Sequence, residues 1–208
     1  MLISFEGIDG SGKSTQAKRL MGRLAVGSRE LLYVREPGGT DVSEKIRELL
    51  LDPNIEMESF TELLLFSAAR AQLVREKMIP VHERGGIIVC DRFYDSTIAY
   101  QGGGRGVADP IWLHGFQKEV VGGLVPDRTY LIRLTVEQAS ERLKVRFGSE
   151  QAADRLESAG DAFFERVFEA YEHLAATEAD RFCVIDGSGS ENEVEAAIWS
   201  DLNEWMDL

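Results

Sequence analysis

The chain has 208 residues, 44% of them hydrophobic and 28% charged, a composition typical of a globular protein with one sizeable core. No run approaches 18 consecutive apolar residues, which excludes a membrane-spanning helix. The first residues, MLISFEGIDG, lack the basic start and cleavage site of an export signal. Cys90 and Cys183 lie in short apolar runs, and we expect both to be buried free thiols in a reducing cytoplasm.

The net charge of −13 is concentrated near the C-terminus. Residues 157–208 contain 14 acidic residues against Arg166 and Arg181, a net charge of −12, which leaves −1 for residues 1–156. Such an acidic chain repels nucleic acid and anionic membranes. If the substrates are anions, we therefore expect their positive contacts within the first three quarters of the chain.

Apolar runs of strand length alternate with helical patterns along the chain. We predict strands at residues 2–6, 31–36, 86–91, 128–134 and 181–186. We predict helices at residues 13–26, 43–51, 59–84, 111–121, 136–146, 161–176 and 191–206. This alternation predicts a three-layer α/β fold, with a five-stranded parallel sheet and helices on both faces. Ligands of such folds bind beyond the carboxyl ends of the strands, so the residues that follow each strand are the candidates for function.

The first strand and helix are joined by GIDGSGKS, which matches the phosphate-binding pattern G-x-x-x-x-G-K-[ST] in full. In this pattern, backbone N–H groups surround phosphate oxygens and the helix N-terminus contributes its dipole. We expect Lys13 to reach the outer phosphates and the Ser14 hydroxyl to bind Mg²⁺. Asp91, which ends the third predicted strand, is a candidate to support the metal directly or through water, although an acid there is also typical of a helix cap.

The P-loop alone does not choose among GTPases, transport ATPases and small-molecule kinases. A guanine-reading N-K-x-D element is excluded because the chain contains no Asn-Lys pair. Transport ATPases are usually larger and carry further signature motifs. At this length, by analogy of fold, a kinase of small phosphorylated or hydroxylated metabolites fits best.

The candidates for the phosphoryl acceptor follow the later strands. The second predicted strand leads into REPGGT, where Arg35 can hold an anion, and Arg47 follows on the next helix. Phe66 and Arg70 are four residues apart, which places them on one face of the long predicted helix. An aromatic ring and a cation in this arrangement can stack on a base and bind its edge, although Phe66 alone is more typical of a core residue.

Several motifs together resemble those of the thymidylate kinases: FEGIDGSGKST, REPGGT, LLFSAARAQ, DRFYDSTIAYQGGGRG, DRLE and FFERVFEAY. The order and spacing match over nearly the whole chain. The resemblance implies a single P-loop kinase domain that transfers the γ-phosphoryl group of ATP to dTMP, with Mg²⁺, in nucleotide biosynthesis. It also implies a homodimer, and the helix predicted at 59–84 is apolar on more than one face, as a dimer contact requires.

Carried over position by position, the resemblance implies a dTMP-binding set. Phe66 would stack on thymine and Arg70 would hydrogen-bond the base. Arg92 and Arg47 would bind the dTMP phosphate, and Asp9 would meet the 3′-hydroxyl group and help to organise the metal. Thr97 and Gln101 would line the base pocket, and Tyr100 would pack beneath the deoxyribose. Arg35 and Glu36 would shape and charge the same cavity.

The resemblance also implies how the donor is held. The ATP-binding set would be the P-loop with one residue of a later helix: Gly7, Ile8, Asp9, Gly10, Ser11, Gly12, Lys13, Ser14, Thr15 and Arg142. Some members of the family have a catalytic arginine at the position of Gly10, which is absent here. Others supply arginines from a lid, and residues 142–157, with Arg142, Lys144, Arg146 and Arg155, match that arrangement.

In the lid arrangement, Arg146 would act on the transition state together with Lys13, Arg92 and Asp9, and Arg142 would pack near adenine. Lys144 stands where many relatives have arginine, and lysine is not an equivalent bidentate donor. A solvated basic helix end is the alternative interpretation of this segment. The glycines at 102–104 we interpret as a flexible rim of the acceptor pocket rather than a second phosphate loop.

Two alternatives stay open at the level of sequence. The chain could phosphorylate another nucleoside monophosphate, such as dCMP or dUMP. It could also be a P-loop protein that binds nucleotides and transfers nothing. Donor, acceptor and lid elements are all present, which favours the enzyme.

Overall fold

The computed structural model describes residues 1–27, 29–147, 155–156 and 159–206, and for Arg146 and Phe147 it describes the backbone alone. Five strands form one sheet in the order β2-β3-β1-β4-β5, and every neighbouring pair is parallel. The strands are β1 (Leu2–Glu6), β2 (Leu31–Arg35), β3 (Ile87–Asp91), β4 (Arg128–Arg133) and β5 (Phe182–Asp186). The predicted five-stranded parallel sheet is confirmed.

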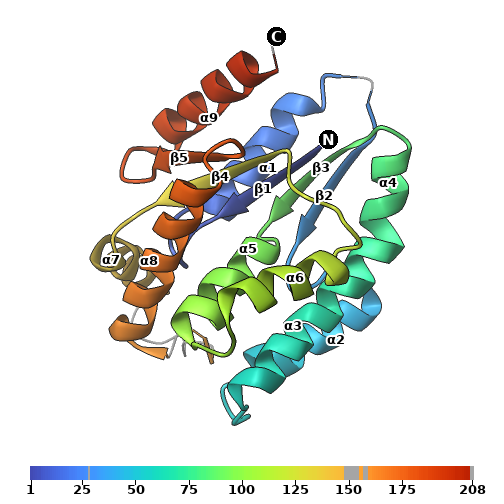
Figure 1. The fold of residues 1–208 in the computed structure, drawn as a ribbon. Coiled ribbons are helices and arrows are strands. Elements are labelled where there is room, and N and C mark those ends of the chain that lie inside the picture. The colour runs from blue at the N-terminus through green and yellow to red at the C-terminus, as the bar shows by residue number, and fades with distance from the viewer. Residues whose placement is uncertain (28, 148–154, 157–158, 207–208) are drawn as a thin grey trace.

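Helices cover both faces of the sheet (Figure 1). They are α1 (Lys13–Leu24), α2 (Asp41–Leu51), α3 (Ser59–Leu73), the π-helical segment η1 (Val74–Met78), α4 (Ile79–Glu83), α5 (Tyr94–Thr97), the π-helical segment η2 (Ile98–Gly104), α6 (Pro110–Val120), α7 (Val136–Phe147), α8 (Asp161–Thr177) and α9 (Glu191–Trp205). Within the described ranges, no helix is both long and apolar enough to cross a membrane.

Two hydrophobic cores lie on opposite faces of the sheet, because alternate residues of a strand point to opposite sides. In β3, Ile88 and Cys90 belong to the core shared with α3, α6 and α8, whereas Ile87 and Val89 belong to the core shared with α1 and α9. The thiol of Cys90 is free and buried, as predicted. Cys183 is also free but only half-buried, because β5 is an edge strand.

Strand register brings the functional segments together. Asp91, the last residue of β3, is the register partner of both Phe5 in β1 and Arg35 in β2. The segments that leave these strands, which begin at Gly7, Glu36 and Arg92, therefore emerge side by side at the carboxyl edge of the sheet.

The long helix predicted at 59–84 runs from Ser59 to Glu83 with the π-helical segment η1 inside it. Pro80 has no N–H, and its ring would crowd the carbonyl group of Glu76, so a regular α-helical ladder cannot continue through it. The widened turn of η1 lies directly before Pro80. Because a π-helical segment of this kind is a short insertion within an α-helix, the hydrophobic pattern of the sequence does not reveal it.

The glycines at 102–104 do not form a flexible rim, and that interpretation is wrong. They belong to η2, where Gly103 and Gly104 pack against α8. A Cβ atom on Gly104 would lie 2.4 Å from the ring of Phe163, and one on Gly103 would lie 2.5 Å from the Cβ of Ala170. The glycines are therefore small residues that allow two helical segments to approach closely.

Candidate active site

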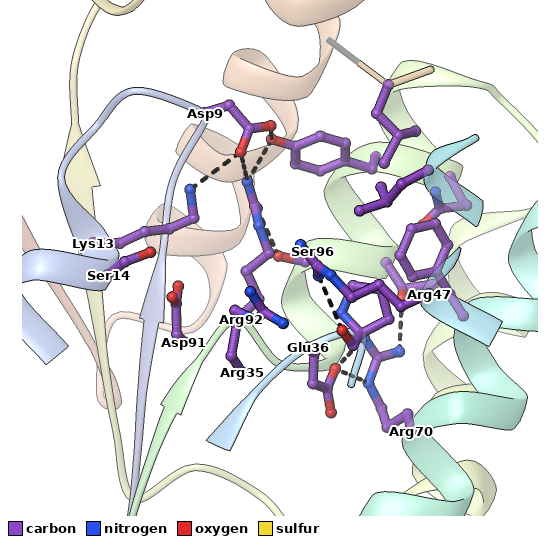
Figure 2. A pocket seen from close by; sticks show the side chains of 17 residues that line it. Asp9, Lys13, Ser14, Arg35, Glu36, Arg47, Arg70, Asp91, Arg92 and Ser96 are labelled. Carbon is purple, nitrogen blue, oxygen red and sulfur yellow. Dashed lines mark hydrogen bonds and ion pairs between the residues drawn. The ribbon is translucent and has the colours of Figure 1, made fainter. Parts of the chain in front are cut away.

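Two adjoining cavities open at the carboxyl edge of the sheet and share Asp9, Lys13 and Ser14. The inner cavity, of about 150 Å³, contains every residue that the resemblance assigns to dTMP (Figure 2). It is lined by Asp9, Lys13, Ser14, Arg35, Glu36, Pro37, Arg47, Leu51, Phe66, Arg70, Asp91, Arg92, Ser96, Thr97, Tyr100, Gln101 and Leu156. Phe66 is a wall residue of this cavity and only half-buried, so it is not a core residue.

The second cavity, the P-loop cleft, has a volume of about 720 Å³. Of the predicted ATP-binding set, all but Gly7 and Ile8 line it. The cleft is also lined by residues that sequence reasoning missed and that follow β5: Gly187, Gly189, Ser190, Glu191 and Val194. The glycine-rich run DGSGS after a predicted strand is the signal that could have identified them.

The P-loop turns on glycines in backbone conformations that other residues rarely adopt. Gly10 and Gly12 have φ values of 85° and 95°, and Gly12 leads directly into α1. A Cβ atom on Gly10 would lie 2.7 Å from the carbonyl oxygen of Ala139 in α7. The structure therefore leaves no room for a side chain at position 10, where some family members have an arginine.

The buried Lys13 and the partly exposed Asp9 lie together at the junction of the two cavities. The Lys13 ammonium group donates a hydrogen bond to the carbonyl oxygen of Ile8 at 3.1 Å and lies 3.6 Å from the Asp9 carboxylate. Burial lowers the pKa of Lys13, and the nearby charge of Arg92 lowers it further. Burial raises the pKa of Asp9, but the charges of Arg92 and Lys13 outweigh that effect and hold the pKa below its usual value. Asp9 is therefore ionised at neutral pH.

Arg92 connects the P-loop to the inner cavity. Its backbone has φ of 70°, the left-handed region that non-glycine residues rarely occupy. Its guanidinium group donates hydrogen bonds to the carboxylate of Asp9 at 2.7 Å (Figure 2) and to the hydroxyl of Tyr100 at 2.9 Å. It also donates to the carbonyl oxygen of Gly7 at 3.1 Å. This strained residue holds a cation where both cavities meet, and strain at such a position is typical of functional sites.

Glu6 lies beneath Arg92 and was missed by sequence reasoning. Its buried carboxylate accepts hydrogen bonds from the Phe93 backbone N–H at 2.7 Å, the Ser96 hydroxyl at 2.6 Å and the Tyr171 hydroxyl at 2.8 Å. Burial, with the nearby Asp95, raises the pKa of Glu6 to about 7. A carboxylate at the end of the apolar run LISFE was the signal that could have identified it.

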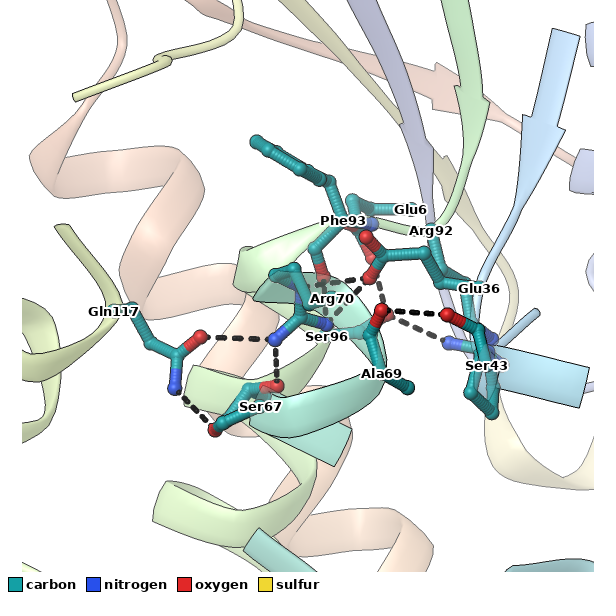
Figure 3. Close-up of polar contacts among 12 residues, drawn as sticks. Glu6, Glu36, Ser43, Ser67, Ala69, Arg70, Arg92, Phe93, Ser96 and Gln117 are labelled. Carbon is teal, nitrogen blue, oxygen red and sulfur yellow. Dashed lines mark hydrogen bonds and ion pairs between the residues drawn. The ribbon is translucent and has the colours of Figure 1, made fainter. Parts of the chain in front are cut away.

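Arg70 is held in the wall of the inner cavity by a network of buried partners (Figure 3). Its guanidinium group donates to Glu36 at 2.7 Å, to Thr97 at 2.7 Å, to the Gln117 side chain at 2.9 Å and to the Phe93 carbonyl at 3.1 Å. Among the residues that the structure describes, Glu36 keeps one buried oxygen, Oε1, with no hydrogen-bond partner. An unpaired buried acceptor facing a cavity is a place for a water molecule or a ligand donor.

The remaining predicted cations lie at the rim of the inner cavity. Arg47 donates a hydrogen bond to the carbonyl oxygen of Pro37 at 3.0 Å, and Arg35 lies 3.8 Å from the Glu44 carboxylate. The Arg35–Glu44 pair is about half exposed, so its attraction is largely screened by solvent. Arg35 can therefore change partner at little cost when an anion enters.

The predicted metal ligands supply oxygen donors beside the P-loop lysine. The Ser14 residue is exposed and lines both cavities, and the Asp91 carboxylate lines the inner one (Figure 2). Asp91 accepts a hydrogen bond from the hydroxyl of Tyr33 at 3.3 Å. Hydroxyl and carboxylate oxygens are ligands that Mg²⁺ prefers, with water and nucleotide phosphates completing its shell. The donor set therefore fits a magnesium ion.

The predicted lid is described in part. Arg142, on α7, donates hydrogen bonds to the carbonyl oxygens of Gly187 at 2.7 Å and Ser11 at 3.5 Å, and so closes one wall of the P-loop cleft. Arg146 lies near the end of α7, but its side chain lies outside the described residues, as do residues 148–154 and 157–158. Arg155 donates to the Glu62 carboxylate at 2.6 Å and to the Leu50 carbonyl at 2.9 Å.

A P-loop beside a cavity walled by arginines, carboxylates and two aromatic rings defines a P-loop kinase whose acceptor is itself an anion. Comparison with known proteins makes this class specific. The family model described as thymidylate kinase matches residues 5–198. The chain belongs to the thymidylate kinase family.

Curated relatives agree in length as well as sequence. A thymidylate kinase of Deinococcus radiodurans is 43% identical over 98% of this chain and 97% of that protein. One of Bifidobacterium longum is 43% identical over 98% of each chain, and one of Thermosipho africanus is 45% identical over 99% of each.

Proposed function

We propose that this protein transfers the γ-phosphoryl group of ATP to dTMP, forming dTDP and ADP in nucleotide biosynthesis. The observation that supports this most strongly is the inner cavity. Every residue that the resemblance assigns to dTMP lines that one cavity, and the cavity shares Asp9, Lys13 and Ser14 with the P-loop cleft. Donor and acceptor would therefore meet at these shared residues.

The reaction needs alignment and charge neutralisation rather than a covalent enzyme intermediate. An oxygen of the dTMP phosphate attacks the γ-phosphorus of ATP, and the bond from that phosphorus to the β–γ bridging oxygen breaks and leaves ADP. The dTMP phosphate is largely ionised at pH 7, so the step requires no general base. Lys13 and Arg92 supply the fixed positive charge between the two anions.

Arg92 would change partner during binding. Its hydrogen bond to Asp9 holds the guanidinium group in place before substrate arrives. The dTMP phosphate would take over part of that interaction, and Asp9 would keep Lys13 and gain the 3′-hydroxyl group of the sugar. Tyr100, whose hydroxyl donates to Asp9 at 3.0 Å, would form the floor beneath the deoxyribose, where a 2′-hydroxyl group fits poorly.

The thymine base would lie against Phe66, with Arg70 at its edge. Arg70 has only N–H donors, which suit a carbonyl oxygen and not an amino group. Thr97 and Gln101 line the same part of the cavity, and Arg47 and Arg35 stand at its rim near the phosphate. The thymine methyl group is worth about 1–3 kcal/mol of discrimination in an apolar pocket, so we expect dUMP to be a poor substrate rather than an excluded one.

Ser14 and Asp91 would hold Mg²⁺, with Asp9 nearby, and the ion would neutralise charge on the β- and γ-phosphates. We further propose that residues 142–157 act as a lid on a single P-loop domain, with Arg142 near adenine and Arg146 at the transferring group. Lys144, exposed on α7, would not replace a bidentate arginine. The free thiols of Cys90 and Cys183 favour the reducing cytoplasm as the location of the enzyme.

Steady-state assays with ATP, Mg²⁺ and each of dTMP, dUMP and dCMP test the proposal. We expect dTDP and ADP in equal amounts and the highest kcat/KM for dTMP. Lys13→Ala should abolish turnover with an unchanged circular dichroism spectrum, and the exposed Lys45→Ala should not. Equal or better turnover of dCMP would contradict the substrate, and no dTDP formation would favour the non-catalytic alternative.

We also propose a homodimer through the long helix. Large apolar side chains are exposed on α3 and the neighbouring α6, where Phe60 is 49% exposed, Leu64 44% and Trp112 47%. The rings of Phe60 and Trp112 are 6.4 Å apart, so the patch is continuous across the two helices. Light scattering at micromolar concentration should give a dimer for the wild type and for Val26→Glu, a change at an exposed residue beyond α1, and a monomer for Leu64→Glu. A wild-type monomer would refute the proposal.

A further inference from the structure

Glu62 is a buried carboxylate that stands behind the wall of the inner cavity. It lies on α3, one helical turn before Phe66, and is 0% exposed. It does not line the cavity itself, whereas Gln101 and Phe66 do. Any effect of Glu62 on a ligand must therefore pass through a neighbour.

Three side chains donate to this carboxylate. The Gln101 amide nitrogen donates at 2.8 Å, Arg105 donates from Nε at 3.3 Å and Nη2 at 3.2 Å, and Arg155 donates from Nη1 at 2.6 Å. Burial raises the pKa of Glu62, but these hydrogen bonds and charges outweigh it, and the pKa is lowered overall. Glu62 is therefore ionised at neutral pH, and an ionised carboxylate can only accept hydrogen bonds.

This property decides which way the Gln101 amide faces. A glutamine side chain can present either its carbonyl oxygen or its NH₂ group to a ligand, and its neighbours select between the two. Because Glu62 can only accept, Gln101 must turn its NH₂ group toward Glu62. Its carbonyl oxygen is then at the other edge of the amide, available to the cavity that Gln101 lines.

We propose that Glu62 is a specificity-determining positioning residue: by holding the Gln101 amide with its oxygen toward the inner cavity, it selects bases that carry a proton at N3. Thymine and uracil have an N3–H that donates to such an oxygen. Cytosine has an unprotonated N3, which is a hydrogen-bond acceptor. It would face the Gln101 carbonyl oxygen, also an acceptor, and no hydrogen bond could form. The inference rests on the proposed function, because it assumes that the cavity takes the base of a pyrimidine monophosphate.

Glu62→Gln tests the proposal with a change of little volume. The two arginines draw the new amide oxygen toward themselves, which leaves the new NH₂ group facing Gln101. Gln101 then turns its oxygen toward position 62 and its NH₂ group toward the cavity, which suits the N3 of cytosine. We expect the ratio of kcat/KM for dTMP to that for dCMP to fall at least tenfold, with the KM for ATP within about twofold of wild type.

The double variant E62Q/Q101E provides the rescue. It exchanges the carboxylate and the amide, keeps the net charge, and again presents an oxygen that can only accept to the cavity. We expect the preference for dTMP to return to within about threefold of wild type. Arg105→Lys is the matched control, because it weakens a different bond to Glu62 and leaves the amide orientation unchanged; its dTMP/dCMP ratio should stay within about twofold of wild type.

The outcomes separate the two proposals. If the wild type does not prefer dTMP, the proposed function fails before Glu62 is tested. If the wild type prefers dTMP and Glu62→Gln keeps that preference within twofold, the role of Glu62 is overturned. Should Glu62→Gln not fold, the double variant, which retains one carboxylate in the network, decides alone: loss of its dTMP preference overturns the role.

Discussion

The two cavities of the site differ in the chemical groups that line them. The P-loop cleft is shaped largely by backbone, with glycines at positive φ, the first turn of α1, and carbonyl oxygens that receive Arg142. The inner cavity is shaped by charged side chains that are paired with one another before any ligand enters, namely Arg92 with Asp9 and Arg70 with Glu36. Backbone N–H groups suit any phosphate, whereas placed side chains suit one ligand, so we expect the selectivity of this enzyme to reside in the inner cavity.

The two regions also differ in how their residues affect the stability of the folded protein. The Arg70–Glu36 pair of the inner cavity is buried, so each of its two charges depends on the other, whereas the Arg92–Asp9 pair is partly exposed. The P-loop cleft instead relies on main-chain groups and on the exposed Ser14 hydroxyl. We therefore expect substitutions in the inner cavity to change both stability and activity, and substitutions at the cleft wall to change mainly the binding of ATP.

The largest expected effect separates the two cavities kinetically. Arg92→Ala removes the cation where dTMP and ATP would meet, and we expect kcat/KM for dTMP to fall on the order of 10³-fold. Arg142→Ala, at the wall of the P-loop cleft, should raise the KM for ATP about tenfold and leave the KM for dTMP within about twofold. Steady-state kinetics with each substrate varied in turn measure both. If Arg142→Ala changed the KM for ATP and the KM for dTMP equally, the division into two cavities would be contradicted.

The next effect tests whether the inner cavity is formed before substrate binds. Glu36→Ala leaves Arg70 buried without its carboxylate partner, since the two side chains are only 2% and 3% exposed. We expect the free energy of unfolding to fall by about 3 kcal/mol in urea denaturation without ligand. The control is Glu30→Ala, which breaks the exposed Glu30–Arg84 pair and should leave the urea midpoint almost unchanged. If both variants behave alike, Arg70 is not held by Glu36 in the free protein.

The smallest effect concerns Glu6, below Arg92. Its pKa is raised from 4.5 in the unfolded chain to about 7 in the fold, so the folded state binds the proton more tightly between these values. The contribution of this group to stability is therefore present below pH 4.5 and is lost as the pH rises toward 7, by about 3 kcal/mol at most. Glu6→Gln cannot titrate. The wild type should lose stability relative to Glu6→Gln between pH 5 and pH 8 in urea denaturation, and a constant difference would show that Glu6 does not titrate in this range.

Sequence periodicity predicted the sheet and its parallel direction, and the P-loop motif with the family resemblance pointed to many of the residues that line the two cavities, but not to the segment after β5. They succeeded because alternating strands and helices admit few topologies and because strand ends meet at one edge. They could not reveal how side chains pair across the cavity. Arg70 and Glu36, or Gln101 and Glu62, are far apart in the chain, and no spacing rule connects them.

The missed features share a second cause. Glu6 and Glu62 lie inside elements whose patterns are set by their apolar neighbours, so a lone acid there carries little weight in a pattern. The glycines at 102–104 were misinterpreted because glycine is typical of loops, whereas here it allows η2 to approach α8. Burial and partners, rather than composition, decide such cases.

A structure with dTMP and a non-hydrolysable ATP analogue bound would show whether donor and acceptor meet at the residues that the two cavities share. We expect the dTMP phosphate within hydrogen-bond distance of Arg92, thymine against Phe66 with its N3 facing the Gln101 oxygen, and the terminal phosphate of the analogue at Lys13. A dTMP molecule in the cleft between the P-loop and the segment after β5, or a base that faces away from Phe66 and Gln101, would contradict it.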